Sequence, residues 1–290
     1  MLMLSQISTC NRDTEVLHTH YANSPLEKSI CFVMTLEYIE IANKNPNISA
    51  VITTQELSEQ VDENKGLIIS GNPKKLFFEL HNKLLEEGYN SMNVSHYIDK
   101  TAQIAESVKI YGNVKIGKNV IIEDFVVVNS NIIIEDNVYI AQNVVLGARG
   151  MHNTMIDDKF VHVKDAGGVH ISQGCEVLAG AIIQKSYFAE FVTIGEQSKI
   201  SVGVKIGHGC NIGKRTLIAG STQIAGYNNI GDDVWIGPSS VLAHGLSIGN
   251  KAQIKLGSVV VKDVKEAENI SGNFAYNHAK RIRNFVKEQR

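Results

Sequence analysis

The sequence predicts a mainly β fold: a parallel β-helix built from six-residue repeats, preceded by a small α/β domain and followed by a short helical tail. Three observations support this prediction. Aliphatic residues recur at every sixth position from Ile98 to Leu146 and again from Ile194 to Ile254. The first 95 residues lack this period and combine short apolar runs with helical patterns. The last stretch is basic and helix-like, so we divide the chain into residues 1–95, 96–265 and 266–290.

Composition indicates an ordinary soluble protein. Hydrophobic residues make up 43% and charged residues 20% of the 290 residues, with a formal net charge of −2. This charge favours neither nucleic acid nor a membrane surface as a partner. The four cysteines are far apart and show no CxxC spacing, so we expect reduced thiols rather than disulfides or a zinc site. No signal-peptide pattern and no apolar run of ~18 residues is present, which predicts a cytoplasmic protein without a membrane span.

The first 95 residues are predicted to form alternating strands and helices. SICFVMTLEYIEIANK contains a short apolar strand and then a helical pattern, while ISAVITT and GLIISGN are typical of strands that end in turn residues. PKKLFFELHNKLLEEG has apolar residues at helical spacing. Pro73 precedes this helix and Gly88 ends it.

The hexads that follow have a physical reason for their period. Each hexad supplies one short strand and a corner, and three hexads make a coil of 18 residues. The aliphatic first residue points into a narrow core, and a small fifth residue fills the same core from the other end of the strand. Gly, Asn and Asp tolerate the positive φ that corners demand. Successive coils stack as parallel strands roughly 4.8 Å apart.

Two segments leave the repeat, at residues 149–168 and 184–193. Segments that leave a rigid solenoid often carry binding residues, although they can also be plain surface loops. The first contains two histidines, two methionines and a phenylalanine, so we predict a role in the site, with His152 as a substrate-binding residue. For the basic tail, NHAKRIRNFVKEQR, we expect a cap on the open end of the solenoid rather than a partner-binding helix.

Two histidines are candidates for acid–base chemistry. His208 and His244 occupy the third place of their hexads and lie 36 residues apart, which is two coils. They should therefore share one edge of the solenoid, roughly 10 Å apart, with Gly226 at the same place between them. We call these three residues the His-Gly-His column. A bare glycine exposes its main-chain N–H as an oxyanion donor beside a base, although polar residues also occupy solenoid corners for no catalytic reason.

The segment ISVGVKIGHGCNIGKRTLIAGSTQIAGYNNIGDDVWIGPSSVLAHGLSIG resembles the UDP-3-O-acylglucosamine N-acyltransferase family of lipid A biosynthesis. His208, in KIGHG, matches the catalytic histidine of that family. Gly226, in IAGY, matches its oxyanion-hole glycine 18 residues later. His244 corresponds to a second active-site histidine but is displaced by one residue, because the order here is Ala-His-Gly.

The resemblance extends from about residue 30 to residue 275. Phe32, Thr35 and Tyr38 occupy the places of a Phe, an Asn and a Tyr that bind uracil in the family. Two aromatic rings can enclose a pyrimidine, and Thr can still form a hydrogen bond. Plain core packing is the alternative for the two aromatic residues. NPKKLFFELHNKLL is similar to the first-domain helix of the family.

The resemblance implies a left-handed β-helix, against the usual right-handed crossover rule, and a homotrimer with active sites between neighbouring solenoids. It implies N-acyl transfer to the amine of a nucleotide-linked amino sugar for lipid A, a part of lipopolysaccharide, or for surface polysaccharide. His208 and Gly226 would be catalytic. Phe32, Thr35, Tyr38, His152 and His244 would bind substrate. The co-substrate would be the thioester of acyl carrier protein or coenzyme A, with no bound metal or cofactor.

Three departures from the family favour a variant activity. The aromatic Gly-Phe-Gly-Phe loop is missing around residues 147–160, the C-terminal helices are reduced to a short tail, and Thr35 replaces Asn. An acetyl-CoA-dependent N-acetyltransferase of a UDP- or dTDP-linked amino-deoxy sugar, as in O-antigen synthesis, fits these changes. Two other classes share the solenoid. A γ-type carbonic anhydrase would need three histidines around zinc. A non-catalytic structural or binding solenoid would show outward-facing columns of a single residue type.

Overall fold

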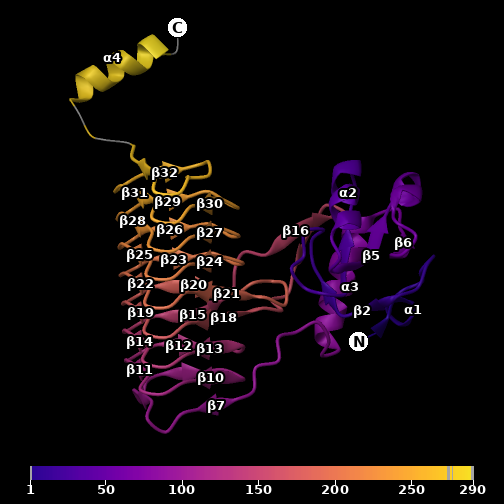
Figure 1. Cartoon of the computed structure of the whole chain (residues 1–290), viewed down its shortest axis with the longest axis horizontal. Coiled ribbons are helices and arrows are strands. Elements are labelled where there is room, and N and C mark those ends of the chain that lie inside the picture. The colour runs from indigo at the N-terminus through magenta and orange to yellow at the C-terminus, as the bar shows by residue number, and fades with distance from the viewer. Residues whose placement is uncertain (1, 273–274, 276, 289–290) are drawn as a thin grey trace.

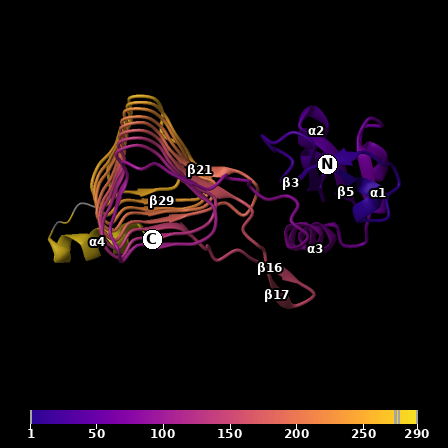
Figure 2. The same cartoon turned by 90° about the horizontal axis from the view of Figure 1, so that it is seen from below.

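The computed structural model describes residues 2–272, 275 and 277–288. A solenoid of stacked coils stands beside a small α/β domain that is formed by the first part of the chain (Figure 1). Seen along its axis, the solenoid is a triangular prism (Figure 2). The coils wind left-handed, and the predicted β-helix is therefore confirmed.

Three parallel sheets form the faces of the prism, each with one strand from successive coils. The first sheet contains β7 (Tyr97–Ile98), β10 (Val114–Ile116), β13 (Ile132–Ile134), β18 (Gly168–Ile171), β21 (Phe191–Ile194), β24 (Asn211–Ile212), β27 (Asn229–Ile230) and β30 (Ser247–Ile248). The second contains β8 (Gln103–Ile104), β11 (Ile121–Ile122), β14 (Tyr139–Ile140), β19 (Glu176–Val177), β22 (Lys199–Ile200), β25 (Leu217–Ile218), β28 (Trp235–Ile236), β31 (Gln253–Ile254) and β33 (Asn269–Ile270). The third contains β9 (Lys109–Ile110), β12 (Val127–Val128), β15 (Val145–Ala148), β20 (Ile182–Gln184), β23 (Lys205–Ile206), β26 (Gln223–Ile224), β29 (Val241–Leu242) and β32 (Val259–Val260).

The core and the corners of the solenoid follow the hexad. First-place residues such as Ile206 and fifth-place residues such as Val204 and Cys210 are buried in one continuous apolar cluster. Fourth-place residues turn the corners in the left-handed region, as Asn119 does with φ of 54°. The 18-residue register is regular, since Leu217 pairs with Trp235 in the next coil. The hexad therefore fixes which residues lie in one column along each edge.

The end of the solenoid differs from the expectation in two respects. Strand β33 pairs with β31 and lies beyond residue 265, where the tail was predicted to begin. Helix α4 (His278–Glu288) stands away from the last coil in Figure 1, so it does not cap the open end of the solenoid. Residues 289–290 of the predicted tail lie outside the described residues.

The N-terminal part is built on a four-stranded parallel sheet in the order β3 (His18–Thr19), β4 (Ser29–Phe32), β5 (Ile48–Thr53) and β6 (Gly66–Ile69). Helices α2 (Leu36–Lys44) and α3 (Pro73–Glu86) and the 3₁₀ helix η1 (Gln55–Gln60) pack around it. Strand β1 (Leu2–Met3), helix α1 (Leu4–Ile7) and strand β2 (Glu15–Val16) complete this part. The helices and strands predicted from residue 30 to residue 88 are confirmed.

The two segments that leave the repeat carry the contact with the N-terminal part. Strands β16 (Asn153–Ile156) and β17 (Lys159–His162) form an antiparallel hairpin that projects from the solenoid (Figure 2). Ile156 and Val163 of this excursion, with Phe188 of the second one, share an apolar cluster with Phe77 of α3. The excursions are therefore the surface on which the α/β part rests. In the stretches that the structure describes, no helix has the length and apolar character needed to span a bilayer.

His81 of α3 forms a buried polar link across this contact. Its Nδ1 lies 2.5 Å from Thr19 Oγ1 and its Nε2 lies 2.9 Å from the carbonyl oxygen of Lys164. Burial lowers the pKa of His81 to about 4. In the unfolded chain His81 should titrate near its ordinary value of about 6.5, so between these two values the unfolded state binds more protons.

We therefore expect the free energy of unfolding to fall as the pH is lowered from 6.5 toward 4. Below pH 4 the titration of His81 should cause no further decrease. The His81 contribution to this loss is on the order of 2–3 kcal/mol. Urea unfolding of the wild type and of His81→Gln at pH 7 and at pH 4.5 measures it, because the variant removes only this titration. The difference in free energy of unfolding between the two proteins should be smaller at pH 4.5 than at pH 7. An equal difference at both pH values contradicts the prediction.

Candidate functional site

The His-Gly-His column lies where the third sheet turns into the first. His208 follows β23, Gly226 follows β26 and His244 follows β29. The ring centroids of His208 and His244 are 6.0 Å apart, closer than the roughly 10 Å expected between two positions two coils apart. The rings lean toward each other over the glycine, since a Cβ on Gly226 would lie only 2.4 Å from His208 Nε2. The bare glycine thus makes room for the His208 ring.

A second column beside it holds a tyrosine between two glycines. At the fourth place of the same hexads stand Gly209, Tyr227 and Gly245. Tyr227 turns its corner with φ of 58°, an unfavourable conformation for a bulky residue. A Cβ on Gly209 would meet the Tyr227 ring at 2.6 Å, so that glycine is required for the ring to fit. The Tyr227 ring lies 5.3 Å from His208 and 5.5 Å from His244, and sequence reasoning did not find it.

The excursions add three further side chains to the column. His152, predicted as a site residue, lies with its ring centroid 4.6 Å from that of His208. Its Nδ1 is 2.5 Å from Asp165 Oδ1. Tyr187, from the second excursion, packs 5.0 Å from His208. Asp165 and Tyr187 lie outside the hexads, and no sequence period could have placed them.

The environment keeps the His208 imidazole uncharged near neutral pH. Burial, and then the neighbouring His152 and His244 rings, lower the pKa of His208 to about 4. Burial also raises the pKa of Tyr227, which therefore keeps its proton. In the described part of the chain, no three His, Cys, Asp or Glu side chains are grouped as ligands of a metal ion. The centre of the site is thus a neutral imidazole with a lone pair available to accept a proton.

Gly226 is a buried glycine whose main-chain N–H is unbound within the part of the chain that the structure describes. Among the described residues it has no hydrogen-bond acceptor, whereas the N–H groups of Ala225 and Tyr227 are both bound to backbone carbonyls. At three other third places the N–H donates to an Asp or Asn side chain of the next coil, as Lys214 N does to Asp232 Oδ1 at 2.8 Å. In the column that place belongs to His244, which forms no such bond to Gly226. An unbound N–H beside a neutral imidazole can stabilise an oxyanion.

An open groove of about 710 Å³ approaches the column along the third sheet. It runs over β15, β20, β23, β26 and β29 and ends at His208 and Gly226. Arg149 and Lys205 place two positive charges along its wall.

A second cavity, of about 330 Å³, is also lined by the two histidines. The solenoid contributes His208 and His244, and the excursions contribute His152 and Tyr187. The N-terminal part completes it with the following side chains: Tyr21, Phe32, Lys74 and Phe78. The site is therefore assembled from both parts of the chain.

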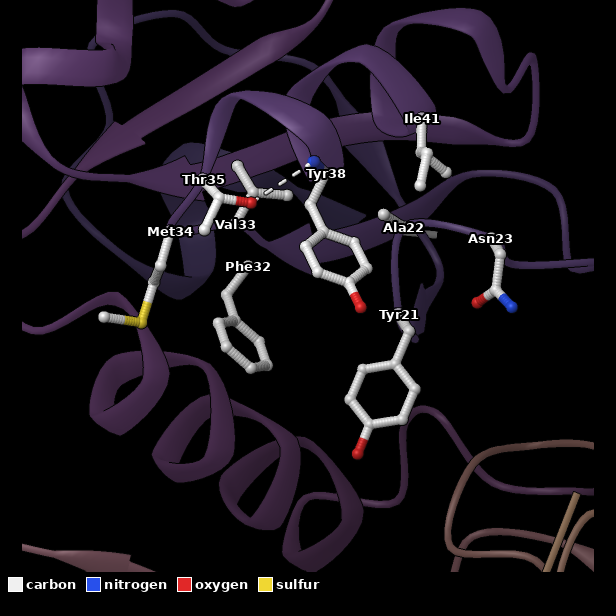
Figure 3. A pocket seen from close by; sticks show the side chains of 9 residues that line it. All are labelled: Tyr21, Ala22, Asn23, Phe32, Val33, Met34, Thr35, Tyr38 and Ile41. Carbon is white, nitrogen blue, oxygen red and sulfur yellow. Dashed lines mark hydrogen bonds between the residues drawn. The ribbon is translucent and has the colours of Figure 1, made fainter. Parts of the chain in front are cut away.

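The third cavity, of about 460 Å³, contains the predicted nucleotide-binding residues (Figure 3). Phe32 ends β4, Thr35 caps α2, and Tyr38 stands in the first turn of that helix. Their side chains, together with Tyr21, project into the same space. Carboxyl ends of parallel strands are where open sheets bind ligands. Thr35 Oγ1 accepts from the N–H of Tyr38 at 3.5 Å, which leaves its own hydroxyl hydrogen free to donate.

The three cavities form one row. Tyr21 and Phe32 line both the third cavity and the second, and His208 and Met151 line both the second cavity and the groove. The third cavity is therefore joined to the second through Tyr21 and Phe32, and the second cavity to the groove through His208 and Met151.

Comparison with known proteins agrees with this interpretation of the repeats. Residues 113–148 match the family described as bacterial transferase hexapeptide (six repeats). The chain is 29% identical over 128 residues to a UDP-3-O-acylglucosamine N-acyltransferase of Herminiimonas arsenicoxydans, covering 44% of this chain and 36% of that protein. It is 33% identical over 115 residues to the enzyme of the same name from Campylobacter curvus, covering 39% of this chain and 36% of that protein.

A solved structure, UDP-N-acetylglucosamine acyltransferase from Campylobacter jejuni, superposes with a TM-score of 0.48 at 19% identity, covering 67% of this chain and 81% of that one. The chain spans just over a third of the length of the curated relatives it matches. The matched stretch is shorter than the span of residues 30–275 expected from the sequence.

Proposed function

We propose that this chain, which carries bacterial transferase hexapeptide repeats and is similar to UDP-3-O-acylglucosamine N-acyltransferases, transfers an acyl group from a thioester to the amine of a nucleotide-linked amino sugar. The observation that carries the proposal is the unbound N–H of Gly226 beside the neutral imidazole of His208. Both groups lie where the second cavity and the groove meet.

The reaction needs only a base and an oxyanion donor from the protein. The sugar amine attacks the thioester carbonyl, and a new C–N bond forms. His208 takes the proton that the nitrogen loses, and the N–H of Gly226 donates to the developing oxyanion. The tetrahedral intermediate then collapses, the C–S bond breaks, and the thiolate recovers the proton as a free thiol. The amine is itself a good nucleophile, so no covalent acyl-enzyme is required.

Each cavity is assigned one part of the substrates. The base of the nucleotide lies in the third cavity between Phe32 and Tyr38, with Thr35 as a hydrogen-bond donor. The amino sugar occupies the second cavity beside His152 and His244. The thioester arm of coenzyme A or acyl carrier protein lies in the groove, which would be closed by a neighbouring solenoid in a cytoplasmic homotrimer.

Free-thiol release by the purified protein tests the proposal. Acetyl-CoA and 3-hydroxyacyl carrier protein are each offered with UDP- and dTDP-linked amino sugars, and the product is identified by mass spectrometry. Amide formation with any of these pairs supports N-acyl transfer, and the pair that turns over fastest gives the donor and the nucleotide. Turnover with acetyl-CoA favours the O-antigen type of activity, and turnover only with the long-chain carrier protein favours lipid A. No thiol release with any pair contradicts the proposal.

Tyr38→Ala should raise KM for the nucleotide sugar roughly tenfold and leave kcat within about threefold, because stacking on one aromatic ring contributes about 1–3 kcal/mol per base. The Tyr38 side chain is 55% exposed, so the thermal midpoint should stay close to that of the wild type. Tyr111→Ala is the matched control, since Tyr111 is 56% exposed and lies outside the three cavities. Equal KM values for the two variants contradict the nucleotide assignment.

A further inference from the structure

His152 and Asp165 form a tightly held pair next to the proposed base. His152 Nδ1 is 2.5 Å from Asp165 Oδ1, and the two side chains are only 3% and 10% exposed. His152 Nε2 is buried and has no hydrogen-bond partner in the part of the chain that the structure describes. A carboxylate bonded to one ring nitrogen orients an imidazole and can stabilise positive charge that develops at the site, while the second ring nitrogen stays open.

The pair is held in place by the fold. Val163 N donates to the carbonyl oxygen of His152 at 2.7 Å, which closes the base of the excursion. Asp165 follows two residues after Val163. The intervening residue, Lys164, donates its main-chain N–H to Asn82 Oδ1 of α3 at 2.9 Å. The docked N-terminal part therefore fixes the position of the carboxylate.

His208 has no carboxylate of its own. Within the described residues, neither ring nitrogen of His208 forms a hydrogen bond, and its nearest imidazole neighbour is His152, nearly perpendicular at 87°. A proton arriving on His208 would place a positive charge in a partly buried site between two other imidazoles. Such a charge needs a nearby negative group to be stabilised.

We propose that Asp165 and His152 are positioning residues for His208: the pair holds the His208 ring edge-on and supplies the negative charge that stabilises the imidazolium formed during acyl transfer. This inference rests on the proposed function. The proton leaves the amine nitrogen, resides on His208, and passes to the departing thiolate, while Asp165 stays ionised and His152 keeps its Nδ1–H toward the carboxylate.

Other charged and titratable groups surround the pair. Those that interact with it or with His208 are His162, Lys185, Tyr187, Glu190 and His244, and Arg149 in turn acts on His162. Lys185 is partly buried, and burial lowers its pKa. Asp165 is the carboxylate that touches an imidazole ring of the site directly, whereas Glu190 is bonded to Ser186 and His20. Removing the Asp165 charge is therefore the specific test.

Asp165→Asn keeps the size of the side chain and removes its charge. We expect kcat to fall about a hundredfold and KM for the nucleotide sugar to stay within threefold. Without the carboxylate the histidine cluster protonates less readily, so the acidic limb of the kcat/KM profile should move to lower pH. Glu135→Gln is the matched control, because Glu135 bonds His170 Nε2 at 2.8 Å outside the three cavities. A kcat within threefold of the wild type, or a lower kcat with an unmoved acidic limb, overturns the proposal.

A second readout does not depend on turnover. Histidine-labelled wild type and Asp165→Asn are titrated by NMR, and the His208 resonance should report protonation at lower pH in the variant. Unmoved titrations overturn the coupling even in an active enzyme. Moved titrations in a protein that acylates no amino sugar support the pair and contradict only the proposed function. If Asp165→Asn does not fold, Asp165→Ser replaces it, and the His208 resonance should again protonate at lower pH than in the wild type.

Discussion

Replacing His208 by alanine is expected to lower kcat by about a thousandfold or more, because the variant lacks the group that accepts the proton of the attacking amine. The ring makes no hydrogen bond within the described residues and is only partly buried, so its loss should cost little stability. We expect the oligomeric state by light scattering and the thermal midpoint to match the wild type. KM for both substrates should change by less than about threefold, since the third cavity is untouched and the groove loses only one side chain at its end.

Thiol release at saturating substrate measures this effect. His170→Ala is the matched control, because it removes a histidine from the solenoid outside the three cavities. Added imidazole should restore part of the rate of His208→Ala by occupying the space left by the ring. A variant that turns over within tenfold of the wild type would show that another group is the base.

Gly226→Ala is expected to lower kcat about a hundredfold, although it adds a single methyl group. That methyl would lie 2.4 Å from His208 Nε2, so the ring must move away from the N–H of Gly226. Loss of one oxyanion donor costs about a hundredfold to a thousandfold in other enzymes. The backbone at Gly226 is outside the left-handed region, so the alanine itself is not strained.

Gly220→Ala provides the comparison for this change. Gly220 stands at the same third place six residues earlier, and its added methyl would lie 3.2 Å from the carbonyl oxygen of Val202. We expect near-normal turnover from it. In a His208→Ala background, Gly226→Ala should cost much less, because the ring it displaces is already gone. Equal losses in the two backgrounds would mean that the glycine acts independently of His208.

The period of the sequence is sufficient to predict the column but not its surroundings. Residues 18 apart must stack, so the hexad alone places His208, Gly226 and His244 on one edge of the solenoid. Their closeness could not be predicted, because the hexad fixes backbone positions and not the direction of each side chain. The Tyr227 ring packs against both histidine rings, at 5.3 and 5.5 Å. A tyrosine at a corner place that usually holds Asn or Gly was the available signal.

Residues from the excursions could not be predicted in the same way. Asp165 and Tyr187 belong to segments without a period, and their positions depend on docking against α3 and the N-terminal sheet. Thr35 was expected to contact the base, and the structure shows in addition that it caps α2. Predicting that cap requires knowledge of the first residue of the helix, which apolar spacing alone does not define.

The 18-residue coil also limits how such a gene can change its length. Gaining or losing one hexad between His208 and His244 would turn every later residue by a third of a turn and move the second histidine to another face. Duplicating a whole coil between them would keep the face but separate the rings by one more strand spacing, about 4.8 Å. Whole coils added before Ile140 or after Ile248 would leave the column as it is. Heritable variation in length should therefore collect at the two ends of the prism and at its corner excursions, and avoid the three coils that carry the column.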